Sequence, residues 1–233
     1  MVFPTQLERK SMWPIVIAVV WAIGILMSGL SPYDRLTWAL EIAPCVIIAP
    51  LLFIGPRGGF TSLLYALILI HGLVLILGGA YSYARVPFGF WLQDVFALSR
   101  NPYDKIGHFM QGFVPAIAAR EILLRWSTIR QGVLLSVAVL LSCLGISAAY
   151  EIAEWWAAIS LGQGADEFLG TQGDMWDTQS DMLLCGIGAA VSLVLLSRSH
   201  NRLLKGTLRK HRVYSQKSIA VPVEEDRQVS LRH

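Results

Sequence analysis

Six long apolar runs dominate this sequence and limit what the chain can fold into. A transmembrane α-helix needs about 20 consecutive, mostly apolar residues, and each of these runs comes close to that length. Only 15% of the 233 residues are charged, whereas soluble domains have about 25%. We therefore predict an all-α fold, a polytopic helical membrane bundle, with spans at about 13–30, 36–54, 60–80, 103–124, 132–159 and 177–197.

The segments outside these runs divide the chain into one domain and a tail. Residues 1–200 are expected to form the six-span transmembrane domain, and residues 201–233 a basic, disordered cytoplasmic tail. Between the third and fourth runs, residues 81–100 include an aromatic stretch too short to cross a bilayer. Because Trp and Phe favour the headgroup zone, this stretch is expected to be an interfacial helix or a lid.

The distribution of Lys and Arg predicts the orientation of the bundle. With both termini in the cytoplasm, the inner segments hold fifteen of the 19 basic residues and the outer segments hold four. Cytoplasmic segments of membrane proteins carry such an excess of positive charge. The prediction is therefore a topology of six spans with both the N-terminus and the C-terminus inside.

Three groups of polar residues lie at the margins of the last three apolar runs, on the side predicted to face outward. Within each group the spacing is three or four residues, which places the members on one helix face. Ionisable side chains inside a bilayer are costly and normally face the bundle interior. We therefore expect a polar pocket between spans four, five and six, lined by Asp104, His108, Gln111, Glu151, Glu154, Asp177 and Asp181.

These residue types suit acid–base or metal chemistry. An imidazole and a carboxyl group can act as a general acid–base pair, and the candidate catalytic residues are Asp104, His108, Glu151, Glu154 and Asp181. One imidazole with several carboxylates also suits a hard or borderline divalent metal ion. Such an ion could hold a lipid phosphate and acidify a water molecule. The candidate metal ligands are His108, Glu151, Asp177 and Asp181.

Simpler structural roles stay open for several of these residues. Asn101 and Pro102 resemble a helix N-cap and first helical position, so Asp104 could complete a capping box. Asp177 could cap the sixth span in the same way, and Lys105 could sit at the headgroup level. Three further acidic residues receive a structural interpretation: Asp166 and Glu167 as solvated loop charges, and Glu121 as a helix partner of nearby arginines.

No other type of site is indicated by the sequence. Cys45, Cys143 and Cys185 lie inside apolar runs and show no CxxC or Cys/His spacing. This placement favours buried structural thiols over a disulfide framework or a zinc site. The sequence also holds no P-loop, no nucleophilic serine elbow and no HExxH motif.

Three motifs resemble those of a known family. YDKIGHFMQGF at 103–113, AYEIAEW at 149–155 and GTQGDMWDTQSDM at 170–182 look like the YjdF-type bacterial inner membrane proteins. That resemblance covers nearly the whole transmembrane region and implies an integral inner membrane protein of undetermined function. Spans four to six are more distantly similar to VanZ-like proteins, which are associated with glycopeptide resistance. The distant resemblance marks only Asp104, His108, Glu151 and Asp181 as candidate positions.

Three function classes stay open on these grounds. The first is an enzyme that acts on an envelope lipid or lipid-linked phosphate, with the bilayer and the lipid as its partners. The second is a structural or regulatory membrane protein whose polar cluster fastens helices. The third is a transporter, which is disfavoured because the sequence shows no internal repeat and no acidic residues through the full depth of the bilayer.

Overall fold

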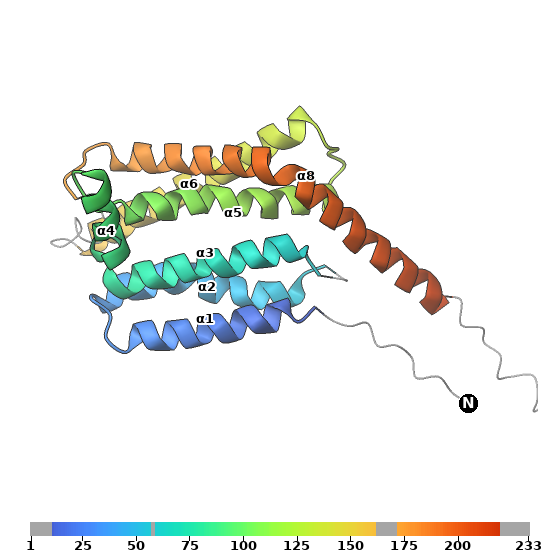
Figure 1. Ribbon diagram of the computed structural model, residues 1–233, viewed down its shortest axis with the longest axis horizontal. Helices are drawn as coiled ribbons and strands as arrows, with labels where there is room; N and C mark the ends of the chain where they lie inside the picture. The colour runs from blue at the N-terminus through green and yellow to red at the C-terminus, as the bar shows by residue number, and fades with distance from the viewer. Residues whose placement is uncertain (1–10, 57–58, 162–171, 220–233) are drawn as a thin grey trace, which may run out of the picture.

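The helices of the structure follow the predicted spans closely. A computed structural model describes residues 11–56, 59–161 and 172–219, and the regular structure within these residues is entirely helical (Figure 1). The long helices are α1 (Trp13–Gly29), α2 (Arg35–Ile54), α3 (Ser62–Tyr81), α5 (Tyr103–Trp126), α6 (Val133–Leu161) and α8 (Asp177–Ile219). A 3-10 helix η1 (Tyr83–Arg85) and the short helix α4 (Pro87–Phe96) lie between α3 and α5.

Local sequence signals explain where several helices begin. The carboxylate of Asp34 accepts a hydrogen bond from the backbone N–H of Thr37 and so caps α2. This hydrogen bond lowers the pKa of the Asp34 carboxyl. Thr61 caps α3 through Leu64 in the same way. Proline stands in the first turn of α1 and of α4, where its missing N–H has no helical partner to lose.

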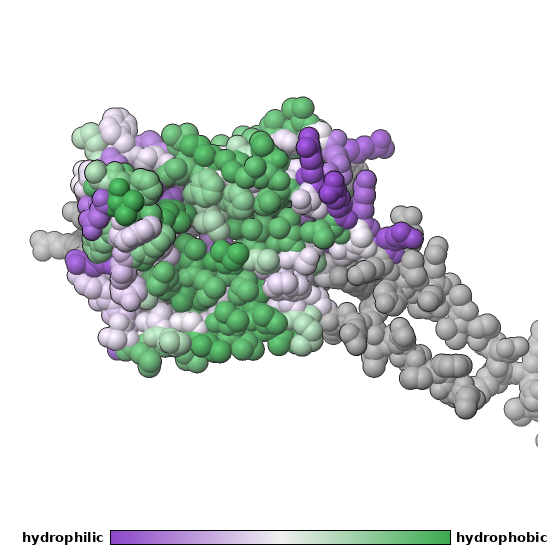
Figure 2. Space-filling view, in the orientation of Figure 1, coloured by the Kyte–Doolittle hydropathy of each residue, from purple (hydrophilic) through white to green (hydrophobic). Residues whose placement is uncertain are grey.

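The surface of the bundle is that of a membrane protein. Helices α2, α3, α6 and α8 are long and apolar enough to cross a membrane, and α1 is an apolar helix of 17 residues. Figure 2 shows a broad apolar belt around the bundle, with hydrophilic residues gathered at both ends. Helix α5 is the polar member of the set, because it carries Asp104, Lys105, Arg120, Glu121 and Arg125. The prediction of a polytopic helical membrane protein is confirmed.

The six long helices form two groups of three (Figure 1). Helices α1, α2 and α3 bury one apolar cluster, which includes Ile17, Trp21 and Tyr65. Helices α5, α6 and α8 bury a second cluster, which includes Val139 and Ala189. The groups meet chiefly between α3 and α5, and successive long helices run in opposite directions along the bundle (Figure 1). As predicted, Cys45, Cys143 and Cys185 are all buried and free.

Two glycines let α5 and α8 approach each other closely. A Cβ atom at Gly112 of α5 would overlap the carbonyl oxygen of Cys185 in α8. Conversely, a Cβ atom at Gly188 of α8 would overlap the carbonyl oxygen of Phe109 in α5. Small residues allow such backbone approach between membrane helices. This crossing matters for function because α5 and α8 carry most of the polar residues at one end of the bundle.

The C-terminal tail differs from the prediction. Helix α8 continues past the expected end of the sixth span at about residue 197 and reaches Ile219, so the first part of the segment predicted as disordered is helical. The physical reason is composition: Leu, Arg and Lys are good helix formers, and no proline occurs between Asp177 and Pro222. Residues 220–233, together with Asp166 and Glu167 of the preceding loop, lie outside the described residues.

Candidate functional site

Asn101 positions the start of α5 at the end of the bundle where α4 lies. Its side-chain oxygen accepts a hydrogen bond from the backbone N–H of Tyr103, at 3.0 Å, and its amide group donates to the carbonyl oxygen of Val86. The side chain of Gln172 bonds to both the N–H and the C=O of Asn101. The predicted positions are one residue off, because Pro102 is the N-cap of α5 and Tyr103 is its first helical residue, but Asn101 does accept a hydrogen bond from the first helical N–H. Asp104 has no such capping bond and faces the bundle interior instead.

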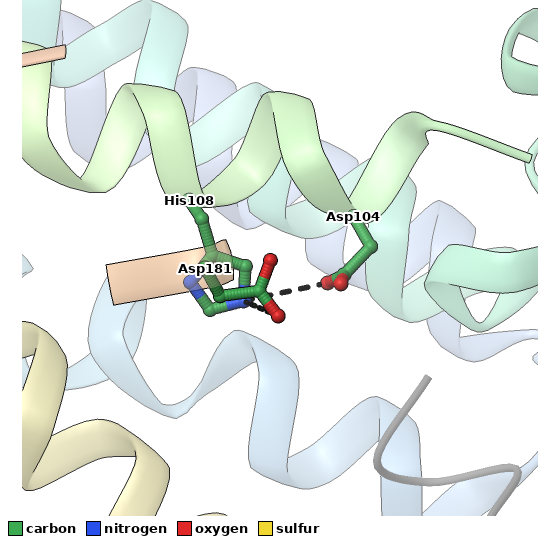
Figure 3. A group of neighbouring side chains, drawn as sticks. All are labelled: Asp104, His108 and Asp181. Carbon is green, nitrogen blue, oxygen red and sulfur yellow. Dashed lines mark ion pairs between the residues drawn. The ribbon is translucent and has the colours of Figure 1, made fainter. Parts of the chain in front are cut away.

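Asp104, His108 and Asp181 converge from α5 and α8 (Figure 3). The Nε2 atom of His108 lies 3.5 Å from Oδ1 of Asp104 and 3.8 Å from Oδ2 of Asp181. One ligand atom from each of these three residues can be chosen so that all lie within 4.8 Å of one another. The predicted i, i+4 face of α5 and the predicted start of α8 thus meet in one cluster.

The cluster is withdrawn from solvent. The exposed fractions are 6% for His108, 9% for Asp104 and 3% for Asp181. Among the described residues, Oδ2 of Asp104 and Oε1 of Glu151 are buried and have no hydrogen-bond partner. A buried polar atom without a partner is costly, so a cation or a proton beside either of these two oxygens would be favourable.

The two ring nitrogens of His108 face different partners. Nδ1 lies 3.1 Å from Oε1 of Gln111, one turn further along α5. Because an amide oxygen only accepts, Nδ1 carries the proton in this contact. Oε1 of Glu151 lies on the same side, 3.8 Å from Nδ1. Nε2 faces the carboxylates of Asp104 and Asp181 at distances longer than those of an ordinary N–H···O hydrogen bond.

Asp177 is held by two cations. Its Oδ1 atom accepts hydrogen bonds from Arg100 and, at 2.6 Å, from Lys105. The ammonium group of Lys105 also reaches Oδ1 of Asp181, at 2.8 Å, so Lys105 pairs with two carboxylates of α8. Its predicted place at the headgroup level stays a prediction. Burial opposes the charge of Arg100, but the hydrogen bond to Asp177 and the nearby carboxylates outweigh it, and the pKa of Arg100 is raised. The predicted role of Asp177 as a metal ligand stays a prediction.

One buried carboxyl group near this cluster was not predicted. Glu41 lies in the second turn of α2, is only 5% exposed, and accepts a hydrogen bond from the hydroxyl group of Tyr150 at 3.3 Å. The ring of Tyr150 lies edge-on to that of His108, with 6.5 Å between their centroids. Glu154 is half-buried and close enough to interact electrostatically with His108. The only signal for Glu41 was a lone carboxyl group inside an apolar run.

A second buried polar network lies at the opposite end of the bundle, around Glu121. The carboxylate of Glu121 is fully buried and accepts hydrogen bonds from the backbone N–H and the hydroxyl group of Thr61. It also binds Arg125, one turn along α5, at 2.6 Å, and Nε2 of His200 in α8 at 3.0 Å. The predicted pairing with a nearby arginine is confirmed, but the contacts to α3 and α8 were not predicted. This network joins three helices.

Comparisons with known proteins agree with this architecture. The family described as "Predicted membrane protein (DUF2238)" matches residues 13–202, which is well over half of the chain. The chain belongs to this family. It is 46% identical to the inner membrane protein YjdF of Escherichia coli (strain K12) over 200 residues, which cover 84% of this chain and 96% of YjdF. No solved structure matches the chain.

These matches bear on the expectations from the sequence. The resemblance to YjdF-type inner membrane proteins is confirmed, and the protein is an integral membrane protein of the bacterial inner membrane, surrounded by the lipid bilayer. The function of this family is uncharacterised. The distant similarity to VanZ-like proteins stays a prediction.

Proposed function

We propose that this protein binds a divalent metal ion through Asp104, His108 and Asp181 and uses it to hold the phosphate of an envelope lipid or lipid-linked headgroup. The proposal includes six spans with both termini in the cytoplasm, which places the cluster at the outward end of the bundle. Glu151 and Glu154 would then serve as acid–base groups beside the metal ion. The observation that carries the proposal is the arrangement of two carboxylates around one imidazole nitrogen.

The distances in the cluster support a metal ion. Nε2 of His108 is 3.5 Å and 3.8 Å from the two carboxylate oxygens. Ligands that each lie about 2.1 Å from a common metal ion are separated from one another by about 3–3.5 Å. A modest closure around an ion would therefore complete the site. One imidazole with two carboxylates favours Mn²⁺ or a similar ion over a soft metal ion.

The helix N-termini beside the cluster support an anionic ligand. The N-terminal ends of α5 and α8 both lie at this end of the bundle (Figure 1), and helix N-termini favour negative charge. Lys105 is within hydrogen-bond reach of Asp181, so a cation already stands beside the proposed metal ligands. A metal ion would add positive charge at the same place and could activate a bound water molecule.

Gln111 is expected to orient His108 for metal binding. Replacing Gln111 by leucine removes the acceptor for Nδ1–H and should weaken Mn²⁺ binding by about 10–100-fold, as loss of the partner of a ligating histidine does elsewhere. Gln111→Glu keeps an acceptor at this position and should preserve binding. Titration of purified protein with Mn²⁺, followed by electron paramagnetic resonance, measures both affinities. Equal Mn²⁺ affinity in the leucine variant and the wild type would contradict this role.

Metal content tests the proposal itself. We expect purified protein in detergent to bind one Mn²⁺ per chain and to melt at higher temperature when Mn²⁺ is added. Asp104→Asn should abolish both effects, because it removes the charge of one of the two carboxylates beside Nε2 of His108. Asp94→Asn is the matched control, since Asp94 is an exposed carboxyl group on α4 at the same end. The control should bind Mn²⁺ like the wild type.

A fastening role is the second candidate, and a specific observation favours it. Lys105 binds Asp177, Ser180 and Asp181, and so ties the first turn of α5 to α8 without any metal ion. In that case Mn²⁺ would neither bind stoichiometrically nor change the melting temperature of the wild type. Lys105→Met would lower the melting temperature regardless of Mn²⁺. This combination of results would exclude the metal site and leave the helix contact as the function of the cluster.

A further inference from the structure

Helix α8 carries a row of basic residues where it leaves the apolar belt. Arg198, Arg202, Lys205 and Arg209 are all exposed. They are spaced by four, three and four residues, so they lie on one face of the helix. We call these four residues the basic stripe. Figure 1 shows that this part of α8 continues past the ends of the other helices.

The basic stripe continues the lipid-facing side of α8. Leu183, Ile187 and Val194 precede the stripe at spacings of four, seven and four residues, and they are 64%, 43% and 79% exposed. Exposed apolar side chains in the spanning part of a membrane helix face lipid tails. The same face therefore passes from lipid tails to basic side chains at the edge of the apolar belt. Figure 2 shows hydrophilic residues at the right-hand end of this belt.

The opposite face of this segment is fixed to the bundle. His200 is fully buried and Leu204 is 5% exposed. The imidazole of His200 bonds to Glu121 and, through Nδ1, to Arg120 of α5. Rotation of α8 about its axis is thereby prevented, and the basic stripe is held on the side away from the bundle.

The described part of α8 holds no acidic residue beside the basic stripe. No acidic residue occurs between Asp181 and Glu224. Among the residues that the structure describes, none of the four stripe residues forms an ion pair with a carboxylate. Four cations on one exposed face attract a surface of opposite charge, and the nearest surface to them is the headgroup layer of the membrane.

We infer that the basic stripe is a binding surface for anionic phospholipid headgroups, such as phosphatidylglycerol. The stripe begins one turn after lipid-facing Val194, within the range over which surface charges attract basic residues near a membrane. Exposed Leu208 borders the stripe and can enter the headgroup layer beside it. This surface lies at the end of the bundle opposite to Asp104, His108 and Asp181, so it is independent of the proposed metal site.

A fluorescent reporter beside the stripe tests this inference. Cys45, Cys143 and Cys185 are at most 1% exposed, so an environment-sensitive thiol dye on Leu208→Cys reports on that position alone. The full chain is placed in lipid nanodiscs of phosphatidylcholine, with or without phosphatidylglycerol. We expect a blue shift of the dye emission only with phosphatidylglycerol, and we expect high salt to remove it. The triple change Arg202→Gln, Lys205→Gln and Arg209→Gln should abolish the shift.

A charge-preserving variant provides the control. Arg202→Lys with Arg209→Lys keeps four positive charges and should keep the blue shift. An attraction to the headgroups of about 1 kcal/mol per charge corresponds to about fivefold per charge in lipid preference, so the triple change has a large effect. The inference is overturned if the emission is the same in both lipid mixtures, or if the glutamine variant keeps the shift. It is also overturned if the lysine variant loses it, because charge would then not carry the contact.

Discussion

Replacing Glu121 by alanine should lower the free energy of unfolding by about 3–5 kcal/mol, the range found when one partner of a buried ion pair is removed. Glu121 is fully buried, and its carboxylate is the common acceptor for α3, α5 and α8. The substitution leaves Arg125 without its carboxylate, and it leaves both the N–H and the hydroxyl group of Thr61 without this acceptor. Denaturant titration in detergent micelles measures the effect.

The hydrogen-bond directions around His200 explain why this loss is not easily compensated. The guanidinium group of Arg120 lies 2.6 Å from Nδ1 of His200 and can only donate. Nδ1 is therefore the acceptor, and Nε2 carries the proton that it donates to Glu121. Without Glu121 the donor at Nε2 loses its acceptor, and turning the ring would place an N–H against Arg120. Each hydrogen bond of the network depends on the others, so the loss of Glu121 also disrupts the contact between His200 and Arg120.

Two further variants make the Glu121 result specific. Arg130→Ala alters an exposed basic residue at the same end of the bundle and should change the free energy of unfolding by no more than about 0.5 kcal/mol. Glu121→Gln keeps an acceptor for Thr61 but removes the charge, and it should fall between the wild type and the alanine variant. If Glu121→Ala is as stable as Arg130→Ala, the network does not hold the three helices together.

Helix bounds and helix faces were predicted well from the sequence, because they depend on the length of each apolar run and on the spacing of residues along the helix. The lengths of the apolar runs predicted the long helices within a few residues at most ends, and only the end of α8 was far off. The spacing of Asp104, His108 and Gln111 predicted one helix face, and His108 does contact both neighbours on it. These predictions needed no knowledge of how the helices pack.

Contacts between distant parts of the chain were out of reach of the sequence. Glu41 and Tyr150 are 109 residues apart, and Glu121 and His200 are 79 apart. Neither pair has a period or a motif that links its members, since the contact depends on which helices become neighbours. The placement of Glu151 and Asp181 near His108 was predicted only because an ionisable group in a bilayer favours the bundle interior. That rule predicts that charged side chains gather inside the bundle, but it does not predict which of them pair.

Replacing Gly112 by alanine should destabilise the protein by at least about 1–3 kcal/mol, which is the usual cost of overpacking a core. The added Cβ atom would overlap a backbone carbonyl oxygen of α8, and a backbone cannot move aside as a flexible side chain can. The helices must separate instead. Thermal unfolding in detergent micelles measures the loss. The matched control is Gly145→Ala in α6, where nothing lies within 4 Å of the added atom.

The same substitution links packing to the proposed metal site. Asp104 and His108 stand on α5, and Asp181 stands on α8, so a wider crossing at Gly112 should separate the two sets of ligands and weaken Mn²⁺ binding. Gly145→Ala should leave Mn²⁺ binding unchanged and stabilise α6 by up to about 1 kcal/mol, because alanine favours helices over glycine. Equal stability of the two alanine variants would show that the close crossing is not required. If Gly112→Ala is destabilised but binds Mn²⁺ with unchanged affinity, the close crossing of α5 and α8 is not needed to hold the metal ligands in position. Helix packing at Gly112 and metal binding would then be independent of each other.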